Sequence, residues 1–271
     1  MIAATDRIVL AAGVTLRQGR LADGVRGESW PLNGSAAFVL GRCGEPIGVT
    51  VREVAESFSL PLETARADVL RFVWHLNRLA LVNVESGSRR VERLHGWLRL
   101  ALRLAPAGSV PASLTRRRPL DTRSALRGLG TCLAACARRT AAVAAVATVV
   151  ALELFSAAGS PGVALPVALG ICTGLGLGLH EAVHAAMLRG VPSALVTRGR
   201  RTFVLHAAVP PGRRSLVALA GPLAVAAIGT GCLAAAALAP VPCLAVAGCP
   251  LAAHALALTV FTGDGRVACG L

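Results

Sequence analysis

Residues 163–188, VALPVALGICTGLGLGLHEAVHAAML, decide the class of this protein, because they place two histidines and a glutamate inside an apolar run of bilayer length. A run of about 20 apolar residues is typical of a membrane-spanning helix. Ionisable side chains are costly in such a helix and are usually kept there for function. The stretch therefore predicts a functional site within a membrane helix.

Three other apolar runs accompany this one, and the four together predict an all-α four-helix transmembrane domain over residues 140–271. The predicted spans are 140–158, 163–188, 216–238 and 241–262. Twelve arginines lie in residues 89–139 and six in residues 189–214, whereas the short loops inside the two helical hairpins contain none. Because arginine marks the cytoplasmic side of a membrane, we expect a multi-pass protein of the bacterial cell membrane with cytoplasmic N- and C-termini.

The composition agrees with this class and argues against others. Of the 271 residues 54% are apolar, and the mean hydropathy is +0.63. These values argue against an ordinary soluble enzyme. A net charge of +14 also occurs in proteins that bind nucleic acid, but the arginines here flank the apolar runs, so we expect no nucleic-acid partner. The eight cysteines, Cys132 and Cys136 among them, form no CxxC pair and are interpreted as buried apolar residues.

Residues 1–88 have the pattern of a small water-soluble α+β domain. Short strands are expected at 7–10, 14–17, 24–30 and 81–84. Between the last two lie three helical segments: Asn33 can cap the first, and Thr50 with Glu53 forms a capping box for the second. The third follows Pro61. Strands, three helices and a strand in this order predict a winged helix-turn-helix domain.

Residues 89–139 are expected to form a basic amphipathic helix followed by a linker. Arginines are interspersed with leucines and a tryptophan between residues 91 and 105, a pattern typical of a helix on an anionic membrane surface. The run Arg116-Arg117-Arg118 lies in a proline-containing stretch. We interpret that run as a solvated segment on the cytoplasmic side.

Four segments of the N-terminal domain resemble the PqqD-like family, which holds precursor peptides of ribosomally made, modified natural products. They are WPLNGSAA (30–37), TVREVA (50–55), ADVLRF (67–72) and LALV (79–82). The resemblance implies that a leader peptide adds as a strand beside the N-terminal sheet and lies against the third helix. Carried over to this chain, the peptide-binding residues are Val25, Trp30, Arg66, Arg71 and Arg78.

A winged helix for DNA, or a structural cap, is the alternative interpretation of this domain. Its third helix carries Glu63 and Asp68 beside the arginines. Acidic side chains among the basic ones do not suit a face that binds phosphates.

The motif His180-Glu181-Ala182-Val183-His184 has the spacing of a zinc site. Residues at i and i+4 of a helix lie on one face about 6 Å apart along the axis, so His180 and His184 can bind one ion. Glu181 is then placed to activate a water molecule, as in HExxH metalloproteases. The motif predicts a Zn²⁺ site with Glu181 as the catalytic residue.

A tetrahedral zinc site needs a third protein ligand, and the candidates are His206, His254 and Asp264. His206 lies in the arginine-rich loop. If the last span is a continuous helix, His254 lies about 15 Å from Asp264 along it, whereas Asp264 reaches the cytoplasmic depth of the two histidines. Asp264 is therefore the predicted ligand.

This motif, AGPLA at 220–224 and GDG at 263–265 together resemble the site-2 protease family of intramembrane zinc metallopeptidases. The resemblance implies zinc ligands at His180, His184 and Asp264, with Glu181 as general base and acid. The sequence departs from the family pattern at Val225, Leu256 and Thr259, where polar residues or proline that help to position substrate are usual. His254 or Thr259 could replace the missing polar group; the alternative is an intramembrane histidine with internal partners.

Three functions remain open. The first is a membrane-embedded zinc metalloprotease that binds and cleaves a precursor (leader) peptide, in maturation or export of a ribosomally made, modified peptide. The second is a regulated intramembrane protease that cuts a membrane-anchored regulator, and the third is a non-enzymatic membrane adaptor that binds peptides. The expected partners are the leader peptide, the lipid bilayer and peptide-modifying or export proteins. Residues 202–205 could offer a strand with which an extended substrate pairs.

Overall fold

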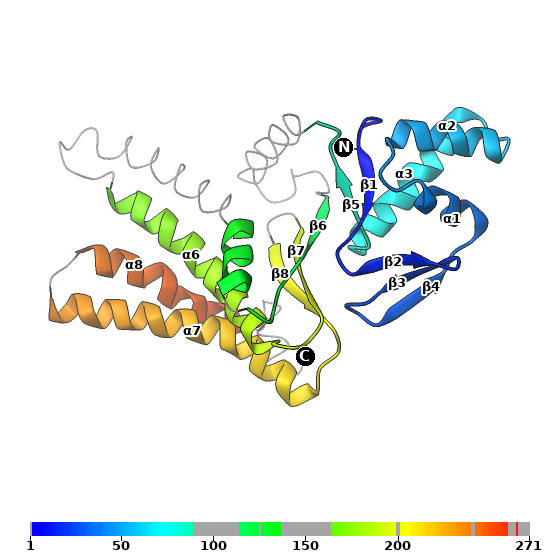
Figure 1. Ribbon diagram of the computed structural model, residues 1–271. Coiled ribbons are helices and arrows are strands. Elements are labelled where there is room, and N and C mark those ends of the chain that lie inside the picture. The colour runs from blue at the N-terminus through cyan, green and yellow to red at the C-terminus, as the bar shows by residue number, and fades with distance from the viewer. Residues whose placement is uncertain are drawn as a thin grey trace, which may run out of the picture. The chain divides into compact units, whose positions relative to one another are not determined.

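In the computed structural model, the chain forms two compact units (Figure 1). Unit 1 comprises Met1–Pro119 and Pro192–Ala207, and unit 2 comprises Leu120–Val191 and Ala208–Leu271. The structure describes residues 2–88, 114–124, 126–136, 164–198, 201–239, 242–259 and 264. N-terminal strands and helices are followed by a mostly helical C-terminal part, as the sequence predicts.

The N-terminal domain within unit 1 contains two small antiparallel sheets and three helices. Its elements are β1 (Arg7–Leu10), β2 (Val14–Arg17), β3 (Arg20–Asp23), β4 (Glu28–Pro31), α1 (Gly34–Gly41), α2 (Ile47–Ser57), α3 (Leu62–Arg78) and β5 (Val82–Glu85). β1 pairs with β5, and β2, β3 and β4 form a three-stranded sheet in that order. The helices close over a common apolar core that includes Ile8, Leu21, Leu40 and Val73.

Local chemistry explains where these elements begin. The side chain of Asn33 accepts a hydrogen bond from the backbone N–H of Ala36 at 2.9 Å, so the predicted cap of α1 is confirmed. The predicted start of α2 at Thr50 is wrong, because the helix begins directly after Pro46 and buries Thr50 in its first turn. A proline just before a helix has a φ suited to its start.

The strand at 20–23 is not expected from the sequence. Gln18 and Gly19 both have positive φ angles, 48° and 69°, which is the geometry of a two-residue hairpin turn that follows the twist of its strands. Gln-Gly is a rarer signal for this turn than Asn-Gly or Asp-Gly. The single predicted segment 24–30 is therefore replaced by β3 and β4.

A second three-stranded sheet completes unit 1. It is formed by β6 (Thr115–Pro119), β7 (Ser193–Arg198) and β8 (Arg201–His206), which are antiparallel neighbours in that order. The interpretation of Arg116-Arg117-Arg118 as a solvated segment is wrong, since all three lie in β6. Successive side chains of a strand point to opposite faces, so one of the three can be buried while its neighbours are not.

Arg117 is that buried arginine, and its guanidinium forms a bidentate ion pair with Asp23. The two N–H···O distances are both 2.7 Å, and neither side chain is exposed to solvent. Burial alone would raise the pKa of Asp23, but the hydrogen bonds and charge of Arg117 and the backbone N–H groups of Arg26 and Val25 hold it below its usual value. The pair joins β3 to a strand 94 residues later in the chain.

Two asparagines hold the backbone of β6 at its other edge. Asn77 donates to the carbonyl of Thr115 and accepts from its N–H, both at 2.8 Å. Asn83 does the same for Arg117, both at 2.9 Å. Because side-chain amides replace a neighbouring strand, the outward N–H and C=O groups of β6 are satisfied.

Unit 2 is helical in its described part, where α6 (Ala164–Met187), α7 (Pro211–Leu238) and α8 (Pro242–Ala252) pack side by side (Figure 1). A shorter helix spans Leu126–Cys136. Among the described residues, α7 is the one helix long and apolar enough to cross a membrane. The predicted span 140–158 lies outside the described residues, and the four-helix transmembrane domain stays a prediction.

Glycines allow the helices of unit 2 to approach closely. A Cβ added at Gly248 of α8 would lie 2.9 Å from the carbonyl oxygen of Gly229 on α7, and one added at Gly178 of α6 would lie 2.6 Å from Leu133. Small residues at helix crossings let the two backbones approach closely.

The expectation of a continuous helix over 241–262 is wrong. α8 ends at Ala252 and continues as the 3₁₀ helix η1 (Ala253–Leu258), after which Thr259 is extended. Pro250 lies inside the last turn of α8, where it removes a backbone donor and weakens the α-helical hydrogen bonding. The change of helix type alters the path of the chain between Ala253 and Thr259.

Candidate metal centre

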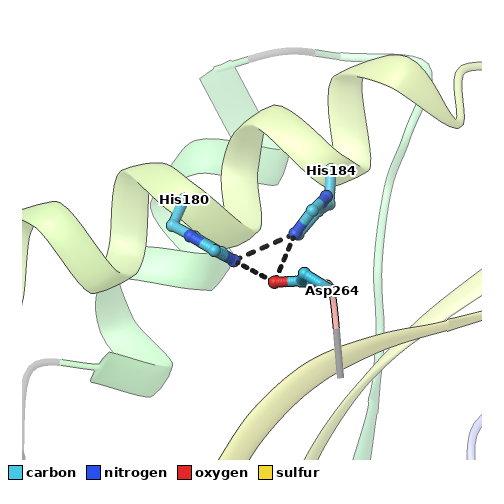
Figure 2. A group of neighbouring side chains, drawn as sticks. All are labelled: His180, His184 and Asp264. Atoms are coloured by element: carbon cyan, nitrogen blue, oxygen red, sulfur yellow. Dashed lines mark hydrogen bonds and ion pairs between the residues drawn. The ribbon is translucent and has the colours of Figure 1, made fainter. Parts of the chain in front are cut away.

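The structure brings the three predicted zinc ligands together (Figure 2). His180 and His184 lie one turn apart on α6, and both are buried. Their Nε2 atoms are 3.0 Å apart, and Oδ2 of Asp264 lies 3.0 Å from Nε2 of His180 and 3.6 Å from Nε2 of His184. Ligand atoms from residues as far as 84 positions apart in the chain therefore converge on one point.

These distances fit a zinc ion. Zn–N and Zn–O bonds of about 2.0–2.1 Å in tetrahedral geometry put the ligand atoms about 3.3 Å from one another. The observed separations of 3.0, 3.0 and 3.6 Å lie around that value. Two imidazoles and one carboxylate are also a ligand set that zinc accepts while keeping its fourth position open.

His184 is held in the tautomer that a metal needs. Its Nδ1 lies 2.6 Å from the carbonyl oxygen of Val217 on α7, and since a carbonyl only accepts, Nδ1 carries the hydrogen. The lone pair of Nε2 is then directed at His180 and Asp264. A hydrogen bond from the second ring nitrogen is the usual way in which a protein orients a metal-binding histidine.

Gly221 makes that hydrogen bond possible. A Cβ at this position would lie 2.7 Å from Nε2 of His184 and 3.0 Å from the carbonyl oxygen of His180. Any larger residue would push α7 away from α6 or displace the imidazole. The glycine of the AGPLA motif thus has a packing role that the sequence alone does not reveal.

Glu181 follows His180 on α6, so its side chain leaves the helix about 100° further round the axis. It is partly buried, and its charge acts on the thiol of Cys132 in the helix Leu126–Cys136. Burial first, and then the charges of Glu181 and Cys136, raise the pKa of Cys132 to about 12. A protonated, fully buried thiol agrees with the interpretation of Cys132 as a small apolar residue.

His254 lies close to the cluster, and the expectation that it is far from it is wrong. Its ring centre is 5.9 Å from that of His180, and its ring lies against Gly176 of α6. Its Nδ1 lies 3.0 Å from the carbonyl oxygen of Pro250. The third candidate, His206, lies in β8 and contacts the carbonyl of Ala207.

The three positions that depart from the site-2 protease pattern differ in their surroundings. Val225 is fully buried on α7, whereas Leu256 is 67% exposed and Thr259 is also exposed. A buried valine cannot supply a polar contact to a peptide.

The residues assigned to the peptide groove fall into two kinds. Val25 is 6% exposed and Trp30 on β4 packs against the core, so both support the sheet. The arginines are exposed on α3, where Arg66 and Arg71 lie near Glu63 and Asp68 at 3.9 and 3.4 Å. The backbone carbonyl of Arg78 accepts a hydrogen bond from Arg198 of β7. The groove itself stays a prediction.

Residues 14–82 match the family model described as Coenzyme PQQ synthesis protein D (PqqD). The matched segment runs from β2 to the start of β5, and it confirms the PqqD-like part of the resemblance. PqqD domains bind precursor peptides and partner enzymes of ribosomal peptide modification, so the match supports a peptide partner for this domain. Comparisons with curated proteins and with solved structures found no match.

Proposed function

We propose that this protein is a membrane-embedded zinc metalloprotease that binds and cleaves a precursor peptide during maturation or export of a ribosomally made, modified peptide. The observation that carries the proposal is the convergence of His180, His184 and Asp264 in a chain that also contains a PqqD domain. Neither feature alone selects this function. A metal site alone leaves the substrate open, and a peptide-binding domain alone leaves the chemistry open.

The residues of the site have distinct roles in peptide hydrolysis. Zinc held by His180, His184 and Asp264 would supply Lewis acidity, which polarises a peptide carbonyl and lowers the pKa of water towards about 7. Glu181 takes the proton of the attacking water and returns it to the leaving amine. Val217 keeps His184 in its metal-binding tautomer through the Nδ1 hydrogen bond.

The PqqD domain supplies the substrate. It shares unit 1 with the β6–β7–β8 sheet, to which it is joined by Arg117, Asn77 and Asn83. In the chain, β7 begins six residues after the end of α6 at Met187. A leader held by the domain is therefore tethered to the chain that carries the site, which raises its effective concentration there.

β8 offers an edge at which an extended peptide can pair. It pairs with β7 on one side only, among the described strands. An added strand would gain backbone hydrogen bonds, and Phe203, which is 37% exposed, could contact its side chains. Such pairing keeps the substrate extended, which exposes the carbonyl that a helical substrate hides.

The test combines metal analysis with cleavage. The full chain is purified in detergent, its zinc is measured by elemental analysis, and it is incubated with a precursor peptide encoded beside its gene. We expect one zinc per chain and cleavage in the leader. Glu181→Gln should keep the zinc and lose cleavage, whereas the double variant His180→Ala, His184→Ala should lose both.

Each other result selects another function. A folded wild-type chain without zinc would leave a membrane adaptor that binds peptides. Zinc with cleavage of a membrane-anchored regulator but not of any leader peptide would favour a regulated intramembrane protease. Phe203→Pro and Val204→Pro test the edge of β8, because successive N–H groups point to opposite edges of a strand, so one of the two removes a donor from the free edge.

A further inference from the structure

Two ring nitrogens beside the metal centre are buried without a hydrogen-bond partner. They are Nδ1 of His180 and Nε2 of His254. Buried polar atoms in folded proteins nearly always have a partner, so each exception needs an explanation. Within the described part of the chain, these two atoms belong to neighbouring rings whose centres are 5.9 Å apart and tilted by 47°.

The two atoms are complementary in hydrogen bonding. Nδ1 of His254 carries a hydrogen because it faces the carbonyl oxygen of Pro250, which leaves a lone pair on Nε2. In His180, Nε2 is directed at Asp264 and His184, so as a metal ligand it uses its lone pair and the hydrogen resides on Nδ1. A donor and an acceptor without partners therefore belong to neighbouring rings.

We infer that His254 is a positioning residue, which accepts the hydrogen bond of Nδ1–H of His180 and so orients that imidazole towards the metal. The inference rests on the metal site of the proposed function and extends it. Metal-binding histidines usually donate their second N–H to a carbonyl, a carboxylate or water, which fixes the ring and increases its basicity. His184 has such a partner in Val217, and His254 supplies the counterpart for His180.

The distance is suitable for this contact. Two imidazoles joined by a hydrogen bond of about 3 Å have ring centres roughly 5 Å apart. The observed 5.9 Å lies within about 1 Å of that separation, so a small approach of the two rings suffices for the contact.

The surrounding backbone makes room for His254 at this place. A Cβ added at Gly176, one turn before His180 on α6, would lie 2.8 Å from Cε1 and 3.3 Å from Nε2 of His254. His254 is the second residue of the 3₁₀ helix that begins at Ala253. The absence of a side chain at Gly176 thus leaves the space that this imidazole occupies beside α6.

The inference is tested by zinc affinity, measured by chelator competition on the full chain in detergent. His254→Leu removes the acceptor and is expected to weaken zinc binding about 10–100-fold, the usual effect of losing such a partner. His254→Gln offers an amide oxygen and should restore most of the affinity. His206→Leu, which changes a histidine of β8 in unit 1 whose Nδ1 faces the carbonyl of Ala207, should bind zinc as the wild type does.

Gly176→Ala provides a second test if the leucine variant does not fold. It keeps every histidine and pushes His254 away, so zinc binding should again weaken. The inference is overturned if His254→Leu binds zinc as tightly as the wild type, or if His254→Gln is as weak as His254→Leu. Absence of zinc from the wild type overturns the proposed function as well, whereas unchanged affinity in the variants overturns this inference alone.

Discussion

Two buried polar clusters, one in each unit, differ in how their charges are compensated. In unit 1 the donors of Arg117 meet the acceptors of Asp23, so the charges compensate each other. In unit 2, ring nitrogens of two histidines and a carboxylate oxygen converge, and none of these residues is permanently cationic. In the first cluster a cation meets an anion directly, whereas the second requires a proton or a metal ion at its centre.

The largest expected effect is on zinc affinity, and it follows from substitutions in the cluster of His180, His184 and Asp264. His184→Ala removes one of three ligand atoms and should reduce zinc affinity by far more than the roughly 100-fold typical of an outer partner. Asp264→Ala should do the same, since the carboxylate carries the compensating negative charge. Equilibrium dialysis against zinc would measure both, and a His184→Ala chain that retains the wild-type affinity would contradict the assigned ligand set.

Substitutions in the Arg117–Asp23 cluster should change the stability of unit 1 and leave the zinc content unchanged. Arg117→Leu removes the bidentate partner of the buried Asp23 carboxylate, which keeps only the Arg26 guanidinium at 3.3 Å and the backbone N–H groups of Val25 and Arg26. Breaking a buried ion pair costs about 3–5 kcal/mol. Hydrogen exchange should show opening of β6 and of its neighbour β7. The matched double variant Asp23→Leu, Arg117→Leu removes both charges and should recover much of the loss. Equal destabilisation in the single and double variants would mean that the charge pair is not the cause.

A smaller loss of zinc affinity is expected where α7 packs against His184. Gly221→Ala places a methyl group 2.7 Å from Nε2 of His184; overpacking of this kind costs about 1–3 kcal/mol, which corresponds to roughly a 10–100-fold loss of zinc affinity. Gly231→Ala on the same helix is the control, because no atom lies within 4 Å of the added Cβ. Similar affinities in the two variants would exclude this steric mechanism.

The smallest expected effect is a loss of stability of unit 1 at acidic pH. The pKa of Asp23 is lower in the folded state than in the unfolded state, where it is about 3.8. The stabilisation by its ion pair is therefore fully present above that unfolded value and is lost as the pH falls through the lower folded value. Unfolding of unit 1 followed by hydrogen exchange at about pH 3 and about pH 6 would measure it. Asp23→Asn should flatten this pH dependence, and a slope that persists in the variant would assign it to other carboxylates.

Much of the molecule follows from local sequence patterns. In the motif at 180–184, the i, i+4 spacing alone places both histidines on one face of the helix. Asn33 caps a helix because its short side chain reaches the backbone N–H of Ala36, three residues later. The PqqD-like segments depend in the same way on spacing within residues 14–82. All of these features are predictable from the sequence because each depends on neighbours in the chain.

Other features could not be predicted, because they depend on partners far away in the chain. The arginine run at 116–118 has the composition of a solvated linker, and only the position of Asp23 on β3 makes burial of Arg117 favourable. The place of His254 escapes prediction for a related reason, since the sequence pattern favours a regular helix across Pro250. The location of a helix break depends on how neighbouring helices pack, here around Gly176 and Gly229.

By itself the sequence determined which chemical groups are present: an apolar C-terminal part with two histidines one helical turn apart, and an N-terminal segment that matches the PqqD family model. Only the tertiary structure decided which carboxylate meets the histidines, which arginine is buried and which imidazole lies beside His180. The physical reason is that spacing along a helix or strand is encoded locally, whereas convergence of side chains from distant segments depends on the packing of the whole unit.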